Sequence, residues 1–519
     1  MTVHEKWGKS FIMEIKIHIE KLLHYALKNN LLEPEDYYFT RNNLMSLFKI
    51  DNICEENVEF SDNKSIAEIL EPILKYAYES RIIEDNTVTS RDKLDAQIMG
   101  LLIARPSEII RKFNAIAENT SIKAATDWYY DFSQKTNYIL TDRIAKNISW
   151  ETNTEFGNIE VTINLSKPEK DPKEIAAASN YKSSGYPKCI LCAENEGYKG
   201  DANLPARQNH RIIPLQLVGE KWFLQYSPYV YFNEHCIVLS DEHRPMKINK
   251  DTFLRLLKFV EQFPHYFIGS NADLPIVGGS ILSHDHFQGG RYDFPMANSP
   301  VEYSFDNKFI NVEAGIVKWP MSVIRLQSQS INDLVEFSEI IYENWKKHSN
   351  PELNIFSHTD EMPHNTITPI ARFKADKYEL DLVLRNNRTT EEFPDGIFHP
   401  HQNLHHIKKE NIGLIEVMGL AILPGRLLSE LSLINQHFSS DSGVLEICEN
   451  HLALQKHKDW IKHLKNKYPK IQYSEISEIL RKEVSYKFLD VLGDSGVFKR
   501  TDSGKKAFIE FVKNLKYEL

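Results

Sequence analysis

A short, glycine-rich stretch near the middle of the chain carries two histidines and a glutamine at alternate positions. The stretch runs from Gly278 to Gly290, and the three residues are His284, His286 and Gln288. On a strand, alternation would place these three side chains on one face. Glycine pairs offer backbone N–H groups to phosphate oxygens, an imidazole can attack phosphorus, and an uncharged amide can donate to a phosphoryl oxygen without titrating. The sequence therefore predicts that this stretch is an active site for a phosphate-containing substrate.

Two ordinary interpretations compete with this one, because paired histidines on a strand are often metal ligands or hydrogen-bonded core residues. The composition of the whole block favours an active site, and Ser283 to Gln288 resembles the His-x-His-x-Gln signature of the nucleotidyl-transferring branch of the histidine triad superfamily. Hydrolases of that superfamily usually carry a third histidine where this chain has Gln288, so the difference favours transfer. Together with Ser270 to Val277, the block is similar to the second, mainly bacterial class of galactose-1-phosphate uridylyltransferases.

This resemblance implies a nucleotidyltransferase of galactose metabolism that moves a uridylyl group from UDP-glucose to galactose 1-phosphate by double displacement. His286 is then the nucleophile, and the Gln288 amide donates to the phosphoryl group. By the same resemblance Asn209 contacts the nucleoside and Asn271 lies near the phosphates, although turn capping is the ordinary role of asparagine. The other residues expected to bind substrate are Gly279, Ser280, Arg291, Lys167 and Lys170. We expect the enzyme to be a homodimer.

Two other functions remain compatible with these residues. A nucleotide-sugar or dinucleotide phosphorylase would use the same histidine and glutamine but accept inorganic phosphate in place of galactose 1-phosphate. A non-catalytic, zinc-stabilised nucleotide-binding module would not need His286 and Gln288 placed together. Activity with galactose 1-phosphate, compared with activity with phosphate, would separate transferase from phosphorylase.

Cys189 and Cys192 have the spacing of half a tetrahedral zinc site. A redox pair is less favoured, because no strand-to-helix junction of the thioredoxin kind surrounds the two cysteines. Candidates for the other two ligands are His235, His243 and His284. The resemblance selects His243 and His284, with His235 in reserve, and implies a structural zinc that leaves His286 available for chemistry.

The bulk properties are those of a soluble, multidomain protein. A chain of 519 residues predicts two to four domains, and a formal net charge of -10 argues against general nucleic-acid binding. Five cysteines spread over this length form no disulfide framework, which indicates a reducing cytoplasm. Met1 to Asn30 has no hydrophobic core of signal-peptide length. The most apolar run, Ile412 to Leu428, contains Glu416 and Arg426, so it predicts a buried strand leading into a helix rather than a membrane span.

Apolar periodicity predicts helical extensions at both ends of the chain and strands with helices between them. The order of these elements fits the α+β fold that the family resemblance implies, with two histidine-triad-like half-domains and antiparallel sheets. The expected divisions are a helical extension at 1–150, a catalytic half-domain with the zinc site at 151–300, a second half-domain at 301–440 and a helical region at 441–519. Asp251 to Phe263 has apolar residues on one helical face, so it predicts an amphipathic helix between a β-hairpin and the motif strands. From about Phe309 the order of hairpin, helix and strands repeats, with its helix at Ile331 to Lys347. Val444 to Lys467 and Ile476 to Leu492 are predicted as amphipathic helices.

Two polar segments allow more than one interpretation. The basic, proline-containing loop from Ser166 to Lys173 suits a diphosphate, although a solvated charge run is the commoner explanation. The segment His399 to His406 holds four histidines and could be a second metal site, a sugar phosphate pocket or a polar loop. No carboxylate partner is fixed by spacing, so a second metal is possible but its ligands stay unassigned.

Overall fold

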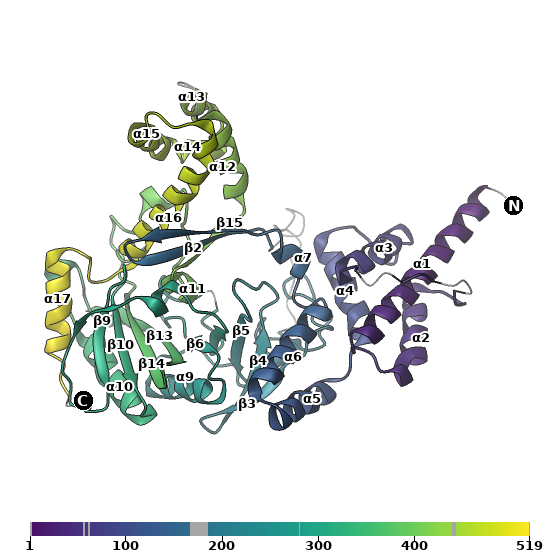
Figure 1. The fold of residues 1–519 in the computed structure, drawn as a ribbon, viewed down its shortest axis with the longest axis horizontal. Coiled ribbons are helices and arrows are strands. Elements are labelled where there is room, and N and C mark those ends of the chain that lie inside the picture. The colour runs from purple at the N-terminus through teal and green to yellow at the C-terminus, as the bar shows by residue number, and fades with distance from the viewer. Residues whose placement is uncertain are drawn as a thin grey trace. The chain divides into compact units, whose positions relative to one another are not determined.

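The computed structural model describes residues 3–54, 58–60, 63–166, 185–279, 281–438 and 443–517. The chain forms two compact units, each made of several segments (Figure 1). The first comprises Met1–Ala145, Ser166–Val230 and Glu234–His243, and the second comprises Lys146–Leu165, Tyr231–Asn233 and Arg244–Leu519. The expected division at residues 150, 300 and 440 stays a prediction.

The first unit begins with helices, as the apolar periodicity predicts. In the first of them Ile15, Ile19 and Leu22 share one face, and each is at most 2% exposed. Ser65, Thr87 and Ser121 begin three of the helices by accepting a hydrogen bond from a backbone N–H of the first turn. The helices are α1 (Val3–Lys28), α2 (Tyr37–Phe48), α3 (Ile66–Glu79), α4 (Val88–Leu102), α5 (Pro106–Asn119), α6 (Ile122–Lys135) and α7 (Thr141–Ile144).

The first unit also contains three antiparallel strands, β3 (Ile213–Leu217), β4 (Glu220–Tyr226) and β5 (Cys236–Ser240). Helix α6 is joined to β4 by hydrogen bonds as well as by apolar contact. The hydroxyl of Tyr226 on β4 donates to the backbone oxygen of Thr126 at 3.0 Å, and the hydroxyl of Tyr138 donates to the backbone oxygen of Tyr226 at 2.9 Å. The end of α6 is therefore fixed against the strands.

The second unit is built on antiparallel strands in the spatial order β7-β6-β13-β14-β10-β9-β8. Helices α9 (Lys250–Gln262) and α10 (Ile331–Lys347) pack against β13 and against each other. Both helices agree with the sequence prediction. The strands are β6 (Phe267–Gly269), β7 (His286–Gly290), β8 (Val301–Ser304), β9 (Glu313–Val317), β10 (Val323–Ser328), β13 (Asn365–Lys374) and β14 (Lys377–Asn386); β11 (His358–Thr359) and β12 (Met362–Pro363) form a separate pair.

A second sheet of this unit joins segments far apart in the sequence. Strand β2 (Gly157–Asn164) pairs antiparallel with β1 (Ile148–Thr154) and parallel with β15 (Leu420–Pro424). The run from Ile412 is thus a short helix, α11 (Leu414–Val417), the buried strand β15, and α12 (Arg426–His437). The prediction of a buried strand leading into a helix is confirmed, and no helix among the described residues is long and apolar enough to cross a membrane.

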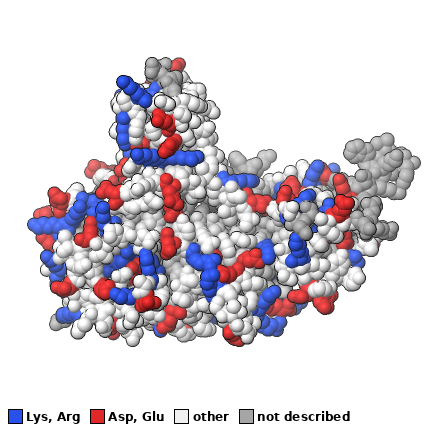
Figure 2. Space-filling model, in the orientation of Figure 1, with Lys and Arg blue, Asp and Glu red and all other residues white. Residues whose placement is uncertain are grey.

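The C-terminal region is helical, but the single helix expected at 444–467 is wrong. The structure has three helices there, because the chain leaves helical geometry at His451 (φ -112, ψ 106) and begins a new helix after His457. These helices are α13 (Gly443–Asn450), α14 (Leu452–Gln455) and α15 (Lys458–Lys467), followed by α16 (Ile476–Ser495) and α17 (Asp502–Lys513). The predicted α+β class with antiparallel sheets is confirmed. Acidic and basic side chains are interspersed on the face drawn in Figure 2.

Candidate active site

The motif strand is shorter than the sequence predicts. Strand β7 begins at His286, so alternation places His286 and Gln288 on one face but does not include His284. The reason is a competing set of backbone hydrogen bonds: Asp285 N donates to Arg244 O at 2.7 Å, which takes the chain before His286 away from β6. The pairing with β6 begins only where Gln288 lies opposite Gly269.

Gly289 shows why the motif is rich in glycine. A Cβ atom at this position would lie 2.5 Å from the backbone oxygen of Phe267 on β6, closer than any real Cβ contact. Only glycine therefore permits the close pairing of β6 and β7, which places His286 at the start of β7.

His286 is 5% exposed, and its Nδ1 lies 2.8 Å from the backbone oxygen of His284. A carbonyl can only accept, so Nδ1 carries the proton and Nε2 carries the lone pair. Burial lowers the pKa of His286 to about 4, partly opposed by the hydrogen bond to the His284 backbone. The ring is therefore neutral at pH 7, with a defined tautomer suited to nucleophilic attack through Nε2.

Asn271 and Gly279, both expected to bind substrate, lie together in the second unit. The Oδ1 of Asn271 accepts from the backbone N–H of Leu414 at 2.9 Å, and a Cβ at Gly279 would lie 2.7 Å from Asn271 Nδ2. Asn271 thus binds the first residue of α11, and Nδ2 is the end of its amide beside Gly279. Arg291 follows β7, and its backbone oxygen accepts from Asn233 Nδ2 at 3.5 Å. Three other expected substrate residues, Ser280, Lys167 and Lys170, lie outside the described residues.

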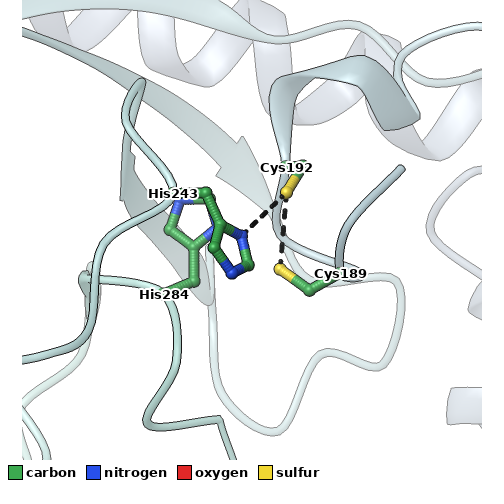
Figure 3. A group of neighbouring side chains, drawn as sticks. All are labelled: Cys189, Cys192, His243 and His284. Carbon is green, nitrogen blue, oxygen red and sulfur yellow. Dashed lines mark hydrogen bonds between the residues drawn. The ribbon is translucent and has the colours of Figure 1, made fainter. Parts of the chain in front are cut away.

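The four residues expected to bind zinc come together as a candidate metal site (Figure 3). The ligand atoms of Cys189, Cys192, His243 and His284 all lie within 4.8 Å of one another. Cys192 Sγ lies 3.2 Å from His243 Nδ1 and 3.6 Å from Cys189 Sγ. Ligands about 2.0–2.3 Å from one ion at tetrahedral angles would be separated by similar distances. These four residues could therefore hold a metal ion, and His235, the reserve ligand, is outside the group.

The segment His399 to His406 uses its ring nitrogens for contacts within the protein. His401 Nε2 donates to the backbone oxygen of Ile397 at 3.1 Å, and His405 Nε2 donates to that of Pro400 at 2.8 Å. Of the residues that the structure describes, Cys189, Cys192, His243 and His284 are the only group of three or more potential ligands close enough to share a metal. The histidine segment therefore offers no metal-binding cluster among the described residues.

The first unit has a cavity of about 500 Å³, a volume in the range of small-molecule sites. Asn209, expected to contact the nucleoside, lines it and donates through Nδ2 to the backbone oxygen of Thr136 at 3.0 Å. Asp95, Asn137 and Arg207 also line this cavity, and no sequence motif marks a specific role for any of the three. They come from three distant segments, so no spacing in the sequence could predict that they lie together. The one local signal was Asn137, an asparagine just beyond the end of α6.

Comparison with known proteins identifies the class of this site. Residues 31–245 match the family model of the galactose-1-phosphate uridyl transferase N-terminal domain, and residues 259–461 match that of the C-terminal domain. A galactose-1-phosphate uridylyltransferase of Caldanaerobacter subterraneus subsp. tengcongensis is 54% identical over 96% of this chain and 97% of its own length. Relatives of the same name from Fusobacterium nucleatum and Bacillus subtilis are 52% and 50% identical, each over 97% of this chain and over 99% and 98% of their own lengths.

Among solved structures, yeast Ap4A phosphorylase Apa2 matches 66% of this chain and 92% of its own, with 13% identity and a TM-score of 0.33. The full-length relatives define the protein as a nucleotidyltransferase. The chain belongs to the galactose-1-phosphate uridylyltransferase family.

Proposed function

We propose that this protein transfers a uridylyl group from UDP-glucose to galactose 1-phosphate through a covalent intermediate on His286. The observation that carries the proposal is the hydrogen bond from His286 Nδ1 to the backbone oxygen of His284, which leaves the Nε2 lone pair as the nucleophile. Membership of the family, at about 50% identity over nearly the whole chain, supports the choice of substrates.

In the first half-reaction, His286 Nε2 attacks the α-phosphorus of UDP-glucose, the bond from phosphorus to the bridging oxygen breaks, and glucose 1-phosphate leaves. In the second, a phosphate oxygen of galactose 1-phosphate attacks the same phosphorus, the N–P bond breaks, and UDP-galactose leaves. The acceptor phosphate is already ionised at pH 7, so no strong base is needed. Because no base is needed, an amide suits the position beside the nucleophile, and Gln288 can donate to the phosphoryl oxygens without titrating.

The remaining substrate contacts are proposals of the same kind. Asn209 would contact the nucleoside in the cavity of the first unit, while Asn271 and Gly279 would lie at the phosphates. Ser280, Arg291, Lys167 and Lys170 are proposed to bind the anionic part of the substrates. We also propose a cytoplasmic homodimer as the working form.

The metal at Cys189, Cys192, His243 and His284 is proposed to be zinc, because two thiolates with two imidazoles are a ligand set typical of structural zinc. A closed set of four protein ligands leaves no open position for substrate. The role of the ion would be to fix the chain around its ligands, and the chemistry would belong to His286.

The decisive experiment uses UDP-glucose that carries its label in the uridylyl part. Incubation with the protein should leave acid-labile, base-stable label on His286, and His286→Gly should remove the label without loss of the fold. Parallel initial-rate lines are expected for the two substrates, as in ping-pong kinetics. Label on another residue, or intersecting lines, would falsify the mechanism, and turnover with inorganic phosphate in place of galactose 1-phosphate would indicate a phosphorylase.

A further inference from the structure

Two asparagine side chains in the wall of the first unit's cavity are both bonded through their Nδ2 atoms. Asn137 Nδ2 donates to Asp95 Oδ2 at 2.6 Å, and Asn209 Nδ2 donates to the backbone oxygen of Thr136 at 3.0 Å. Asn137 is 6% exposed and Asn209 is 5% exposed. Neither amide oxygen accepts a hydrogen bond from the described residues, and neither is among the fully enclosed atoms without a partner. Each Oδ1 is therefore accessible, in a side chain that lines the cavity.

The same cavity also presents a cation. The guanidinium of Arg207 lies over the ring of Tyr138, 5.2 Å from its centroid, and forms no ion pair with any carboxylate that the structure describes. The two other acidic side chains of the wall have donors of their own. Asp92 pairs with Arg143, and Asp201 accepts from the backbone N–H of Asn203. The cavity thus offers two fixed acceptors and one charged donor.

We propose that Asn137 binds the nucleoside part of the nucleotide sugar, accepting a hydrogen bond through Oδ1, and that Asp95 positions its amide. This inference rests on the proposed function and adds two residues to it. A nucleoside fits the arrangement because its imide N–H and ribose hydroxyls are donors for the amide oxygens, while its carbonyl oxygens accept from Arg207. Apolar walls at Leu140, Ile190 and Pro228 suit the faces of a flat ring.

Asp95 is assigned a positioning role because an amide has two unlike ends. Asp95 Oδ2 accepts from Asn137 Nδ2, so this contact holds the Nδ2 end of the amide against the carboxyl and leaves Oδ1 for the ligand. The Oδ1 of Asp95 itself is enclosed and has no donor among the described residues, which is a costly arrangement for a carboxyl. Burial, with a contribution from nearby Asp92, raises the pKa of Asp95 to about 8. A group that costs stability in this way is expected to have a function.

A purely structural role would also explain an asparagine at this position. Asn137 has a φ of 53° just after α6, and asparagine is common at that left-handed position after a helix. Glycine adopts the same backbone without strain, so Asn137→Gly removes the amide and keeps the conformation. The backbone requirement alone gives no reason for Asp95.

The test measures both half-reactions in the intact protein. In Asn137→Gly, kcat/KM for UDP-glucose should fall about tenfold, the loss of one hydrogen bond to the ligand. In contrast, kcat/KM for galactose 1-phosphate should stay within about twofold, because the nucleoside contact is present both before and after the second attack. The Kd of UMP, measured by calorimetry, should rise by the same factor by which kcat/KM for UDP-glucose falls. Asn30→Gly, at an exposed asparagine with a φ of 54° just after α1 and outside this cavity, is the matched control and should change neither kcat/KM for UDP-glucose nor the Kd of UMP.

Asp95 is tested through a conservative pair of variants. Asp95→Leu should lower kcat/KM for UDP-glucose as Asn137→Gly does, and Asp95→Asn should restore it, since an amide oxygen can also accept from Asn137 Nδ2. The double variant Asp95→Leu with Asn137→Gly should be no worse than either single variant. If Asn137→Gly fails to fold, the contrast between Asp95→Leu and Asp95→Asn carries the same test.

The outcomes separate this inference from the proposed function. If the wild type transfers the uridylyl group and Asn137→Gly keeps the wild-type kcat/KM for UDP-glucose and the wild-type UMP affinity, the role of Asn137 is overturned. Additive losses in the double variant overturn the positioning role of Asp95. A wild-type protein without transfer activity sinks the proposed function instead, and the UMP affinities then decide the binding role of Asn137 alone.

Discussion

His406 and His457 face each other through their Nδ1 atoms, which lie 2.9 Å apart among the C-terminal helices. The Nε2 of His457 lies 2.9 Å from Glu430 Oε2, so the carboxylate accepts from it, and neutral His457 then accepts at Nδ1 from His406 Nδ1–H. Glu430 also pairs with Arg426 and Lys456. The two imidazoles therefore form a buried relay that is satisfied when both are neutral.

This relay predicts loss of stability in mild acid. Burial, the His457 ring and the cations Lys487, Arg426 and Lys456 lower the pKa of His406 to about 3, against 6.5 for an ordinary histidine. The unfolded chain then binds more protons as the pH falls from 6.5 toward 3, so the folded state loses stability in that window, by about 1–2 kcal/mol between pH 7 and pH 5.

Urea denaturation at the two pH values measures this change. His406→Asn should reduce the difference, because asparagine can donate to His457 Nδ1 without titrating. His463→Asn, at an exposed histidine of α15, should leave the difference as in the wild type. An equal effect of both variants would contradict the assignment to the relay.

Asp95, in the first unit, predicts a pH dependence of stability opposite to that of the histidine relay. Its raised pKa, caused mainly by burial, means that the folded state holds this proton more tightly than the unfolded chain does. Stability therefore falls as the pH rises from about 4 to about 8. Asp95→Asn should gain about 3–4 kcal/mol relative to wild type between pH 5 and pH 8. Asp51→Asn, at an exposed aspartate, should show no such gain.

The group of four candidate metal ligands predicts that removal of one ligand lowers metal content and thermal stability. Elemental analysis should find about one tightly bound zinc per chain, and Cys189→Ser should lower both metal content and Tm, because a structural site contributes its binding energy to folding. Cys54→Ser, at a cysteine outside the group, is the control. A metal-free preparation of unchanged Tm would contradict a structural zinc site.

Gln288 predicts that the uridylyl intermediate is stable in water until an acceptor arrives. The amide cannot act as a general base, so hydrolysis of UDP-glucose without galactose 1-phosphate should be slow. Gln288→His should raise it by about 100-fold, the lower end of the range of general base catalysis. Gln262→His, at an exposed glutamine that ends α9, should not. Rapid hydrolysis by the wild type would contradict transfer as the natural reaction.

The sequence by itself determined the elements that depend on local patterns. Apolar periodicity located α9 and α10, because an amphipathic helix must bury one face whatever it packs against. The strands expected at Thr366 to Phe373 and Leu380 to Arg385 lie within β13 and β14. The four candidate metal ligands were also named from the sequence, but only two of them by spacing. The CxxC pair is local, while the choice of His243 and His284 depended on a family resemblance.

Only the tertiary structure decided which residues meet when no pattern links them. The start of β7 at His286 depends on Asp285 N finding the backbone oxygen of Arg244, a partner 41 positions away that periodicity cannot reveal. The cavity that joins Asp95, Asn137 and Arg207, and the relay from Glu430 through His457 to His406, are likewise products of packing. A sequence pattern specifies the face that a residue presents, whereas hydrogen bonds between distant segments form only once the folded chain has brought donor and acceptor within about 3 Å.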